Sequence, residues 1–379
     1  MPGTKKALPE VDSNLGVLRQ KRGVSAAQLA RVAGVTRQTI YAVEAGTYVP
    51  NTALALKLAR ALEVTVEELF TLAGDTSPSD LRHDTAALLP GTASSEPGQP
   101  VQLCRVDKRL FASAPSPVPW YFPASDAVVS TTPLRGKAKV QVFHAEESFR
   151  NRILVAGCDP AISVLAHNVL GAGIELVLAH RNSSQSLALL RDGCIHVAGT
   201  HLRDDSTGES NVGAIDRLFP RSSVAVISFA VWEEGVLTAR GNPKGIRGIE
   251  DFARADVRIV NRESGAGSRQ LLDAHLKRLG MPVRKVKGYE REAQGHLPAA
   301  WFVQNGSVDA CISTRASARA FGLGFLPLVS ERYDLVIRRE HMDSPGIQAL
   351  LDTLSRSSFR REIESLGGYD TRAAGQRMR

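Results

Sequence analysis

The sequence lacks any segment that could cross a membrane, because its 379 residues contain no run of eighteen consecutive apolar side chains. The first eight residues are polar and basic and do not hold the apolar core of a secretory signal. Cysteine is scarce: the four thiols lie far apart and form no CxxC pair, which favours reduced side chains over a disulfide framework. We therefore expect a cytoplasmic protein with no membrane partner.

The common catalytic motifs are lacking too. No GxSxG elbow, HExxH helix or GxxxxGK[ST] loop occurs, and the segment SGAGSR at residues 264–269 has the glycines of a phosphate loop without its lysine. Cys194, His196 and His201 suggest a metal site, but strand alternation puts the first two on one face and His201 beyond the strand, with no fourth ligand evident. We predict no enzyme activity, no cofactor and no metal.

Length and composition indicate several folded domains. An apolar fraction of 43% and a charged fraction of 23% allow a packed core, and the chain is long enough for two or three domains. The formal net charge is +8, which permits nucleic-acid binding. Between Leu15 and Arg60 seven basic residues stand against one acid, Glu44. This excess is either a solvated helical face or a DNA-binding surface.

The pattern along the chain predicts five segments. Short helices are followed by a stretch rich in Ser, Thr, Pro and Gly, then by β-rich sequence with a hairpin turning near Asp107 and Lys108, and then by alternating strands and helices. That alternation favours a parallel or mixed sheet covered by helices. The predicted boundaries are 11–74 for a helical domain, 75–100 for a linker, 101–150 for a β-rich bridge, 151–370 for an α/β domain and 371–379 for a basic tail.

The N-terminal segment carries strong helix signals. Ser25 with Gln28 forms a capping box, and the helix that follows is expected to bury Leu29 and Val32. Gly34 suits a tight turn before the next helix.

Further helix starts follow at regular intervals. Thr36 is a good N-cap for a helix that buries Ile40 and Val43. A fourth helix begins after Pro50 and Asn51, and a second capping box, Thr65 with Glu68, starts a fifth.

This five-helix pattern resembles the phage-repressor (Cro/CI, xenobiotic-response-element) helix-turn-helix family over about residues 13–72. The matching positions are Leu29-Ala30, Gly34-Val35, Thr36-Arg37, Thr39-Ile40 and Glu44-x-Gly46-x-x-x-Pro50. The resemblance implies a homodimer bound to a double-stranded DNA operator, with the second helix of the motif in the major groove. The residues expected at the DNA are Gln28, Thr36, Arg37, Gln38, Thr39 and Tyr41. Ala26 departs from the family, which often has a phosphate-binding Gln there. A helical bundle used for protein contacts is the alternative.

Residues 151–370 resemble the periplasmic-binding-protein fold, in the branch similar to molybdate-binding proteins. The matching stretches are GCDPAISVLA, GCIHVAGTHL followed by Asn211, NRESGAGSR, VQNGSVDACIS and LGFLPLVSERYDLVI. The resemblance implies two lobes joined by crossing strands, with a ligand in the cleft between them. We place one lobe at about 151–235 plus 335–370 and the other at about 240–330. The expected fold class is therefore an all-α five-helix domain plus an α/β two-lobed domain.

Small residues before a predicted helix suggest an anion site at residues 264–269. Backbone N–H groups at a helix start, hydroxyls and the helix dipole favour a negative ligand, and a guanidinium can clamp an oxyanion in two places. The expected donors are Ser264, Gly265, Gly267, Ser268 and Arg269. The alternative is a tight turn in which Ser268 is only an N-cap.

Other residues are expected at the same cleft because they follow strands or open helices. They are Ser183, Ser184, Thr200, His201, His296 and Tyr333, whereas Asp159 is expected only to cap its helix. The resulting hypothesis is a one-component transcriptional regulator that senses molybdate, tungstate or a molecule related to the molybdenum cofactor. The alternatives are a sensor domain that binds another small molecule or only contacts another protein, and an enzyme fused to a DNA-binding module.

Overall fold

The computed structural model describes residues 11–72, 82–91, 96–114, 124–202 and 211–379. The chain divides into two compact units, Met1–Leu81 and Arg82–Arg379. The predicted linker and bridge fall partly outside the described residues, at 75–81, 92–95 and 115–123, and so do residues 73–74 of the predicted helical domain and residues 203–210 of the predicted α/β domain. Each unit is described by itself.

The first unit is a five-helix domain, as predicted. Its helices are α1 (Leu15–Lys21), α2 (Ala26–Ala33), α3 (Arg37–Glu44), α4 (Thr52–Leu62) and α5 (Val66–Leu69). The sequence did not predict the short antiparallel pair of β1 (Val11–Ser13) and β2 (Phe70–Leu72), which joins the two ends of the unit. The capping boxes of α2 and α5 and the N-cap of α3 are confirmed.

The core of the first unit is built from the apolar faces of α1 to α5. Leu29, Ile40 and Leu58 are buried together, while Val32 is 67% exposed, so the prediction that it faces the core is wrong. Arg19 on α1 binds Glu44 on α3 with both carboxylate oxygens, at 2.6 and 3.2 Å. This half-buried bidentate pair holds the end of α3 against α1.

The second unit begins with a closed five-stranded barrel. Its strands are β3 (Arg82–Leu88), β4 (Pro100–Val106), β5 (Arg109–Ser113), β6 (Ala127–Val129) and β7 (Lys137–Val142), in the order β3-β5-β4-β6-β7. The predicted hairpin is confirmed, with Asp107 at its turn in a left-handed conformation. The predicted linker 75–100 is wrong at residues 82–88, because β3 pairs there with β5 and β7 and closes the barrel. The predicted bridge is most of that barrel.

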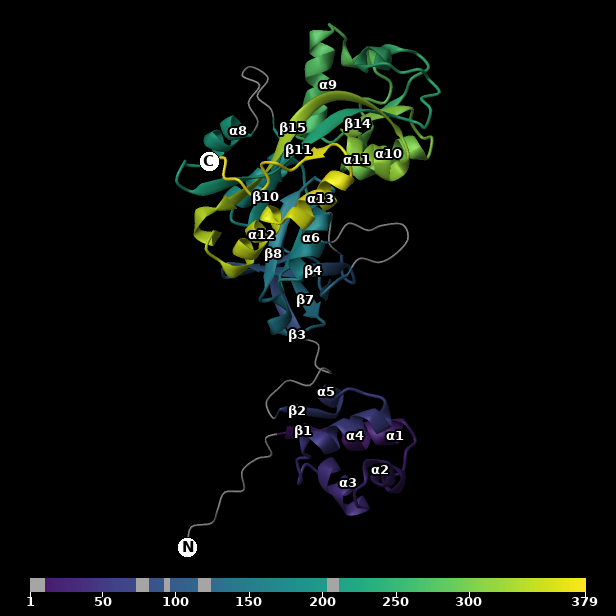
Figure 1. The fold of residues 1–379 in the computed structure, drawn as a ribbon, viewed down its shortest axis with the longest axis vertical. Coiled ribbons are helices and arrows are strands. Elements are labelled where there is room, and N and C mark those ends of the chain that lie inside the picture. The colour runs from purple at the N-terminus through teal and green to yellow at the C-terminus, as the bar shows by residue number, and fades with distance from the viewer. Residues whose placement is uncertain (1–10, 73–81, 92–95, 115–123, 203–210) are drawn as a thin grey trace. The chain divides into compact units, whose positions relative to one another are not determined.

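Two lobes follow, as predicted, and they share one nine-stranded sheet (Figure 1). The first lobe holds the parallel strands β8 (Arg152–Gly157), β9 (Glu175–His180) and β10 (Val197–Thr200) with α6 (Ile162–Leu170), α7 (Ser183–Arg191), α8 (Val212–Leu218), α12 (Pro345–Ser355) and α13 (Ser357–Ser365). The second lobe holds β12 (Ile259–Arg262), β13 (Glu292–Ala293) and β14 (Ala310–Thr314) with α9 (Gly267–Arg278), α10 (His296–Gln304) and α11 (Arg315–Phe321).

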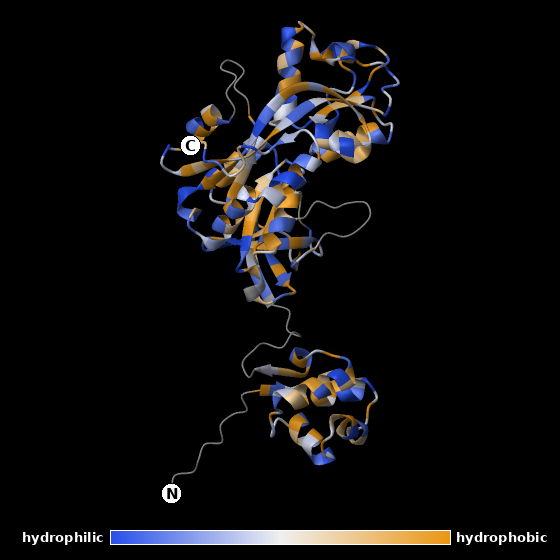
Figure 2. Ribbon diagram, in the orientation of Figure 1, coloured by the Kyte–Doolittle hydropathy of each residue, from blue (hydrophilic) through white to orange (hydrophobic). Residues whose placement is uncertain are grey.

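The lobes are joined by two long strands, β11 (Val224–Thr238) and β15 (Gly324–Arg338). They pair antiparallel along nearly their whole length, from Val224 opposite Arg338 to Thr238 opposite Gly324. Because both strands run through both lobes, side chains at their middle lie at the lobe junction. Figure 2 shows apolar residues concentrated along the central strands, with polar residues more common on the outer helices.

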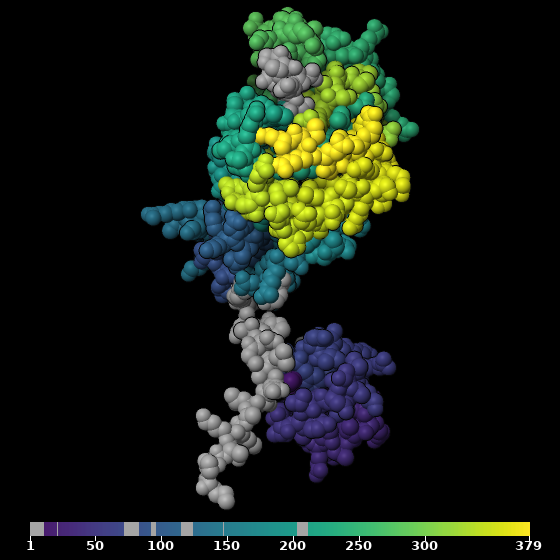
Figure 3. Space-filling view, turned by 60° about the vertical axis from the view of Figure 1, so that its left-hand side comes forward, coloured from purple at the N-terminus to yellow at the C-terminus, as the bar shows by residue number. Residues whose placement is uncertain are grey.

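The C-terminal residues are not a free basic tail, so that prediction is corrected. β16 (Tyr369–Asp370) pairs with β11, and the chain then continues beside the same strand. Ser228 N donates to Gln376 O at 2.9 Å, and Met378 N donates to Val226 O at 2.8 Å. Figure 3 shows the C-terminal segment, in yellow, lying against the surface of the second unit. The C-terminal residues find hydrogen-bond partners in the backbone of β11, on the side of that strand that β15 does not cover. The basic composition of the segment gives no sign of this pairing.

Among the described residues, no helix combines the length and the apolar character that crossing a membrane requires.

A buried ion pair fixes the barrel to the first lobe. Arg152 at the start of β8 binds Asp126 of the barrel at 2.6 Å and Glu175 at 2.7 Å, and it also donates to the carbonyl of Leu103 at 2.9 Å. Asp126 accepts a further hydrogen bond from Leu103 N at 2.7 Å. The side chains of Arg152 and Asp126 are each only 8% exposed. The barrel is therefore held to the first lobe within the second unit, since breaking this junction leaves buried charge unpaired.

We expect Asp126→Ala to lower the free energy of unfolding of the second unit by up to about 3–5 kcal/mol, because it removes the buried carboxylate that binds Nη1 and Nη2 of Arg152 and leaves the half-exposed Glu175 as the remaining carboxylate partner. Urea denaturation followed by tryptophan fluorescence measures this unit selectively, because all three tryptophans lie after residue 81. The control is Arg105→Ala, which breaks the exposed Arg105–Glu146 pair and is expected to cost less than about 1 kcal/mol. Equal effects of the two variants would contradict the junction.

Candidate functional site

The first unit presents a polar helix face to solvent. Thr36 accepts from Thr39 N at 3.1 Å and so begins α3, whose exposed residues include Arg37, Gln38 and Tyr41. The Arg37 guanidinium donates to the Tyr41 hydroxyl at 3.4 Å, one helical turn on. These side chains are free of the core and lie at the N-terminal part of the helix, the part that reads bases in helix-turn-helix proteins.

Two of the residues predicted to contact DNA, Gln28 and Thr39, use their side chains for contacts within the first unit. The Gln28 side-chain oxygen accepts from Ser25 N at 2.9 Å, so its main task is to cap α2. Thr39 is half-buried, and its hydroxyl lies 2.9 Å from that of Thr36. Both remain at the surface, but Arg37, Gln38 and Tyr41 are the more available groups.

In the second unit, the two lobes meet through hydrogen bonds between a helix start in one and a loop in the other. Asn182 caps α7 and donates from Nδ2 to Ser264 O at 3.0 Å. The hydroxyl of Ser184 donates to Gly265 O at 3.3 Å. Gly265 has φ +87°, a left-handed conformation that favours glycine. The SGAGSR segment is thus a lobe–lobe contact.

His201 lies at the centre of this junction. It is buried, its Nδ1 lies 2.9 Å from Glu331 Oε2, and its backbone N donates to the Ser183 hydroxyl at 3.0 Å. Its ring packs edge-on against Trp232 at 4.8 Å between centroids. Burial alone would lower the pKa of His201, but the nearby Cys158 and Glu331 outweigh it and raise that pKa well above the ordinary value.

The second lobe contributes buried groups to the same cluster. His296 opens α10, and its Nδ1 lies 3.2 Å from the Ser313 hydroxyl. Ser268 donates to Glu234 Oε1 at 2.6 Å. Burial and the charge of Glu331 raise the pKa of Glu234 to about 7, and burial together with the charge of Arg262 lowers the pKa of His296 well below its ordinary value.

Asp159 and Tyr333 shape the turn after β8. The Tyr333 hydroxyl accepts from the backbone N of Cys158 and of Asp159, at 3.2 and 3.4 Å. Asp159 Oδ1 accepts from Ala161 N at 2.8 Å and from the Tyr369 hydroxyl at 2.6 Å. The N-cap of α6 is Ala161 and no side chain caps that helix, so the expectation that Asp159 caps its helix is wrong. Burial raises the pKa of Asp159 to about 6.

Six buried polar atoms of this junction have no hydrogen-bond partner among the residues that the structure describes. Buried polar groups in folded proteins are almost always paired, so such a cluster is typical of a ligand site. The cluster draws on the first lobe, the second lobe and the crossing strand β11. The atoms are Asp159 Oδ2, His201 Nε2, Trp232 Nε1, Glu234 Oε2, Arg262 Nη1 and His296 Nε2.

Two predicted ligand residues point elsewhere. Arg269 donates to the carbonyl of Arg262 at 3.2 Å, pairs with Glu292 and lies over the ring of Tyr289, so it is not the expected oxyanion clamp. Thr200 is buried and its hydroxyl donates to Asn211 at 3.4 Å. The long side chain of Arg269 reaches the carboxylate of Glu292, which is 23 residues further along the chain. The sequence around Arg269 therefore gives no sign of this ion pair.

Cys194, His196 and His201, which the sequence analysis weighed as a metal site and set aside, do not form one group. Leu154 N donates to His196 Nδ1 at 3.0 Å, and the His196 ring faces that of His341 rather than His201. Cys194 contacts the carbonyl of Asp192.

Five cluster residues were missed by the sequence analysis. Cys158 and Arg262 each sit at the carboxyl end of a parallel strand, where α/β sheets bind ligands, and that rule could have found them. The crossing strands carry the other three, Trp232, Glu234 and Glu331. For Glu234, the local sequence signal was its position as an acidic residue within the apolar run of residues 224–238.

A cavity of about 520 Å³ opens beside the junction, between α7, α8 and the start of α9. It is lined by Ser184, Asn211 and Gln270 among others, but by none of the six unpaired atoms. We therefore place the candidate ligand site at the buried cluster.

Two families match the two units. The PBP superfamily domain matches residues 167–355, and a helix-turn-helix domain matches residues 17–69. The chain is 31% identical over 241 residues to the uncharacterized protein YvgK of Bacillus subtilis (strain 168), covering 63% of this chain and 78% of that protein. It is 46% identical over 55 residues to the uncharacterized HTH-type transcriptional regulator YgzD of the same organism, covering 14% of this chain and 83% of YgzD.

Solved structures resemble this chain more distantly. A putative phosphate ABC transporter substrate-binding protein from Clostridium perfringens has 13% sequence identity and a TM-score of 0.44, covering 57% of this chain and 98% of that one. At this similarity its bound phosphate says nothing about the ligand of the present chain.

We expect Gly267→Ala to destabilise the lobe junction. A Cβ at Gly267 would lie 2.5 Å from His201 Cε1 and 2.7 Å from the carbonyl oxygen of His201, so the second lobe must move away from the first. The expected loss is about 1–3 kcal/mol in the free energy of unfolding, measured by urea denaturation. The control is Gly171→Ala, whose Cβ meets only an ordinary contact at 3.6 Å. Equal stability of the two variants would count against a tight junction.

Proposed function

The chain belongs to the PBP superfamily and carries a helix-turn-helix domain at its N-terminus, and from this premise we propose that it is a one-component transcriptional regulator. The first unit binds operator DNA, as a homodimer. The second unit binds a small ligand between its lobes and controls the first. The observation that carries the proposal is the set of six unpaired polar atoms, contributed by both lobes and buried where they meet.

The mechanism follows from where those atoms lie. Asp159 and His201 belong to the first lobe, and Arg262 and His296 belong to the second. A ligand that contacts both sets is bound more tightly by the closed arrangement than by an open one. Only such a difference in affinity can shift the population of closed molecules and so alter DNA binding.

For the ligand, we propose an oxyanion, molybdate or tungstate, or an anionic molecule related to the molybdenum cofactor. Trp232 Nε1 and Arg262 Nη1 are donors without a partner in the part of the chain that the structure describes, and the raised pKa of His201 keeps a proton available there. Asp159 and Glu234 have pKa values of about 6 and 7, so near neutral pH a fraction of each carboxyl is protonated and can donate to an anion. Discrimination from sulfate rests on the size of the closed site.

Calorimetry on the full chain tests the ligand. We expect molybdate and tungstate to bind more tightly than sulfate or phosphate, and Trp232→Phe to weaken binding roughly ten- to 150-fold, the worth of a hydrogen bond to a charged group. Trp301→Phe is the matched control, because Trp301 lies on α10 and is 39% exposed. Absence of heat with every tetrahedral oxyanion would overturn the anion assignment while leaving DNA binding intact.

The DNA-binding face is tested on an operator selected from random DNA by the full chain. We expect Arg37→Ala and Gln38→Ala each to weaken operator binding by about 1–3 kcal/mol, roughly five- to 150-fold, because each removes an exposed group that can read a base edge. Fluorescence anisotropy measures the affinity. Arg221→Ala removes an exposed positive charge from the second unit and is expected to change little. A loss as large in this control would point to non-specific charge instead.

A further inference from the structure

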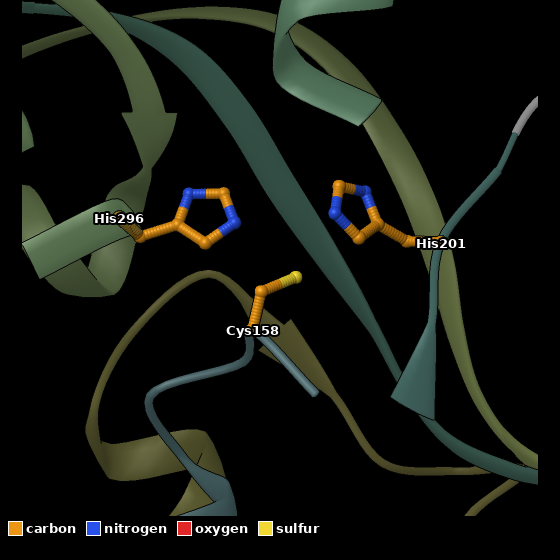
Figure 4. A group of neighbouring side chains, drawn as sticks. All are labelled: Cys158, His201 and His296. Atoms are coloured by element: carbon orange, nitrogen blue, oxygen red, sulfur yellow. The ribbon is translucent and has the colours of Figure 1, made fainter. Parts of the chain in front are cut away.

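Three metal-ligating side chains converge within the buried cluster. One ligand atom each from Cys158, His201 and His296 lies within 4.8 Å of the others, and all three residues are buried. Cys158 follows β8 and His201 follows β10 in the first lobe, while His296 opens α10 in the second. Figure 4 shows the two imidazole rings facing one another across a gap, with the Cys158 thiol directed toward it.

Both histidines are oriented by a neighbour through Nδ1. His201 is held by Glu331 at 2.9 Å, and His296 is held by the Ser313 hydroxyl at 3.2 Å. The Nε2 atom of each ring is buried and without a partner among the described residues. Metal-binding histidines usually have this arrangement, in which a carboxylate or another polar group fixes one ring nitrogen and the other nitrogen binds the ion.

We propose that Cys158, His201 and His296 bind a transition-metal ion of the zinc and cobalt class between the two lobes. One thiolate and two imidazoles form a ligand set that such ions prefer. Bonds of about 2.0–2.3 Å to nitrogen and sulfur require only a small inward movement of ligand atoms that already lie within 4.8 Å of one another. Three protein ligands leave the fourth tetrahedral position open, as in zinc sites that bind water or a substrate.

The charges around the cluster support a cation. Glu331 contacts His201 directly, and Glu234 lies 3.8 Å from His296 Nδ1. Arg262 is buried nearby and binds Glu263 through Nε at 2.8 Å, which partly offsets its positive charge and leaves Nη1 as its one atom without a partner among the described residues. A divalent ion compensates the Glu331 carboxylate and the thiolate, and its open position accepts an oxygen atom of an anion. The metal site goes beyond the proposed sensing of an oxyanion and stands on its own geometry.

Cobalt is the probe, because Co²⁺ reports both geometry and thiolate ligation in its absorption spectrum. The full chain, purified with a reductant and then freed of metal by a chelator, is titrated with CoCl₂ in the absence of molybdate. We expect one equivalent to bind, with the visible bands of a tetrahedral ion and a near-ultraviolet sulfur-to-cobalt charge-transfer band, and Zn²⁺ to displace it. Failure of the wild-type protein to bind Co²⁺ stoichiometrically, or binding without the charge-transfer band, overturns the proposal.

Variants separate the ligands from their surroundings. Cys158→Ser is expected to abolish the charge-transfer band, His296→Gln to weaken cobalt affinity at least tenfold, and Glu331→Gln to weaken it about 10- to 100-fold while keeping the band. Cys194→Ala and His167→Gln are matched controls outside the cluster and are expected to bind normally, and circular dichroism verifies that each variant is folded. A charge-transfer band that survives in Cys158→Ser overturns the assignment.

Molybdate calorimetry on the metal-free and the cobalt-loaded protein keeps the two proposals apart. Molybdate binding without cobalt binding supports the proposed function alone, and overturns the metal site. Cobalt binding without any response to oxyanions supports the metal site, and overturns the anion assignment.

Discussion

The antiparallel pairing of β11 with β15 is the constraint on which both lobes and the site depend. In this register Trp232 lies opposite Glu331, and Ala230 lies opposite Tyr333. Trp232 and Glu331 both contact His201, and Tyr333 holds the turn that carries Cys158. A shift of one residue would turn these side chains to the other face of the sheet and dismantle the cluster. The connection between the lobes and the centre of the site are therefore the same structure.

The parts that the sequence predicts well are those fixed by local spacing. The capping boxes at Ser25 and Thr65 each need only two residues three positions apart, and both are present. His201 and His296 were expected at the cleft because each follows a strand or opens a helix, and both lie in the cluster. Gly265 was expected near a ligand, and it lies in the lobe contact instead.

The parts that the sequence does not predict depend on pairing over long distances. Glu234 on β11 and Glu331 on β15 can be recognised as members of the cluster only when the pairing of these two strands is known. The barrel was missed because its first strand, β3, has a composition close to that of the polar stretch around it and closes only against β7. The side chain of Arg269 was captured by Glu292, a neighbour brought in by β13.

The unpaired atoms also explain why a ligand could act as a switch. Closing the lobes over a buried polar group that lacks a partner costs about 1–3 kcal/mol for each group. The junction contains six such atoms, offset in part by lobe contacts such as the one from Asn182 to Ser264. The closed arrangement is thus poorly favoured by the protein alone, and a ligand that satisfies several of these atoms at once changes the balance steeply. In the proposed regulator, replacing the cluster by apolar side chains would therefore stabilise the closed form and abolish the response to a ligand, because the cost of burying these polar groups is what the ligand offsets.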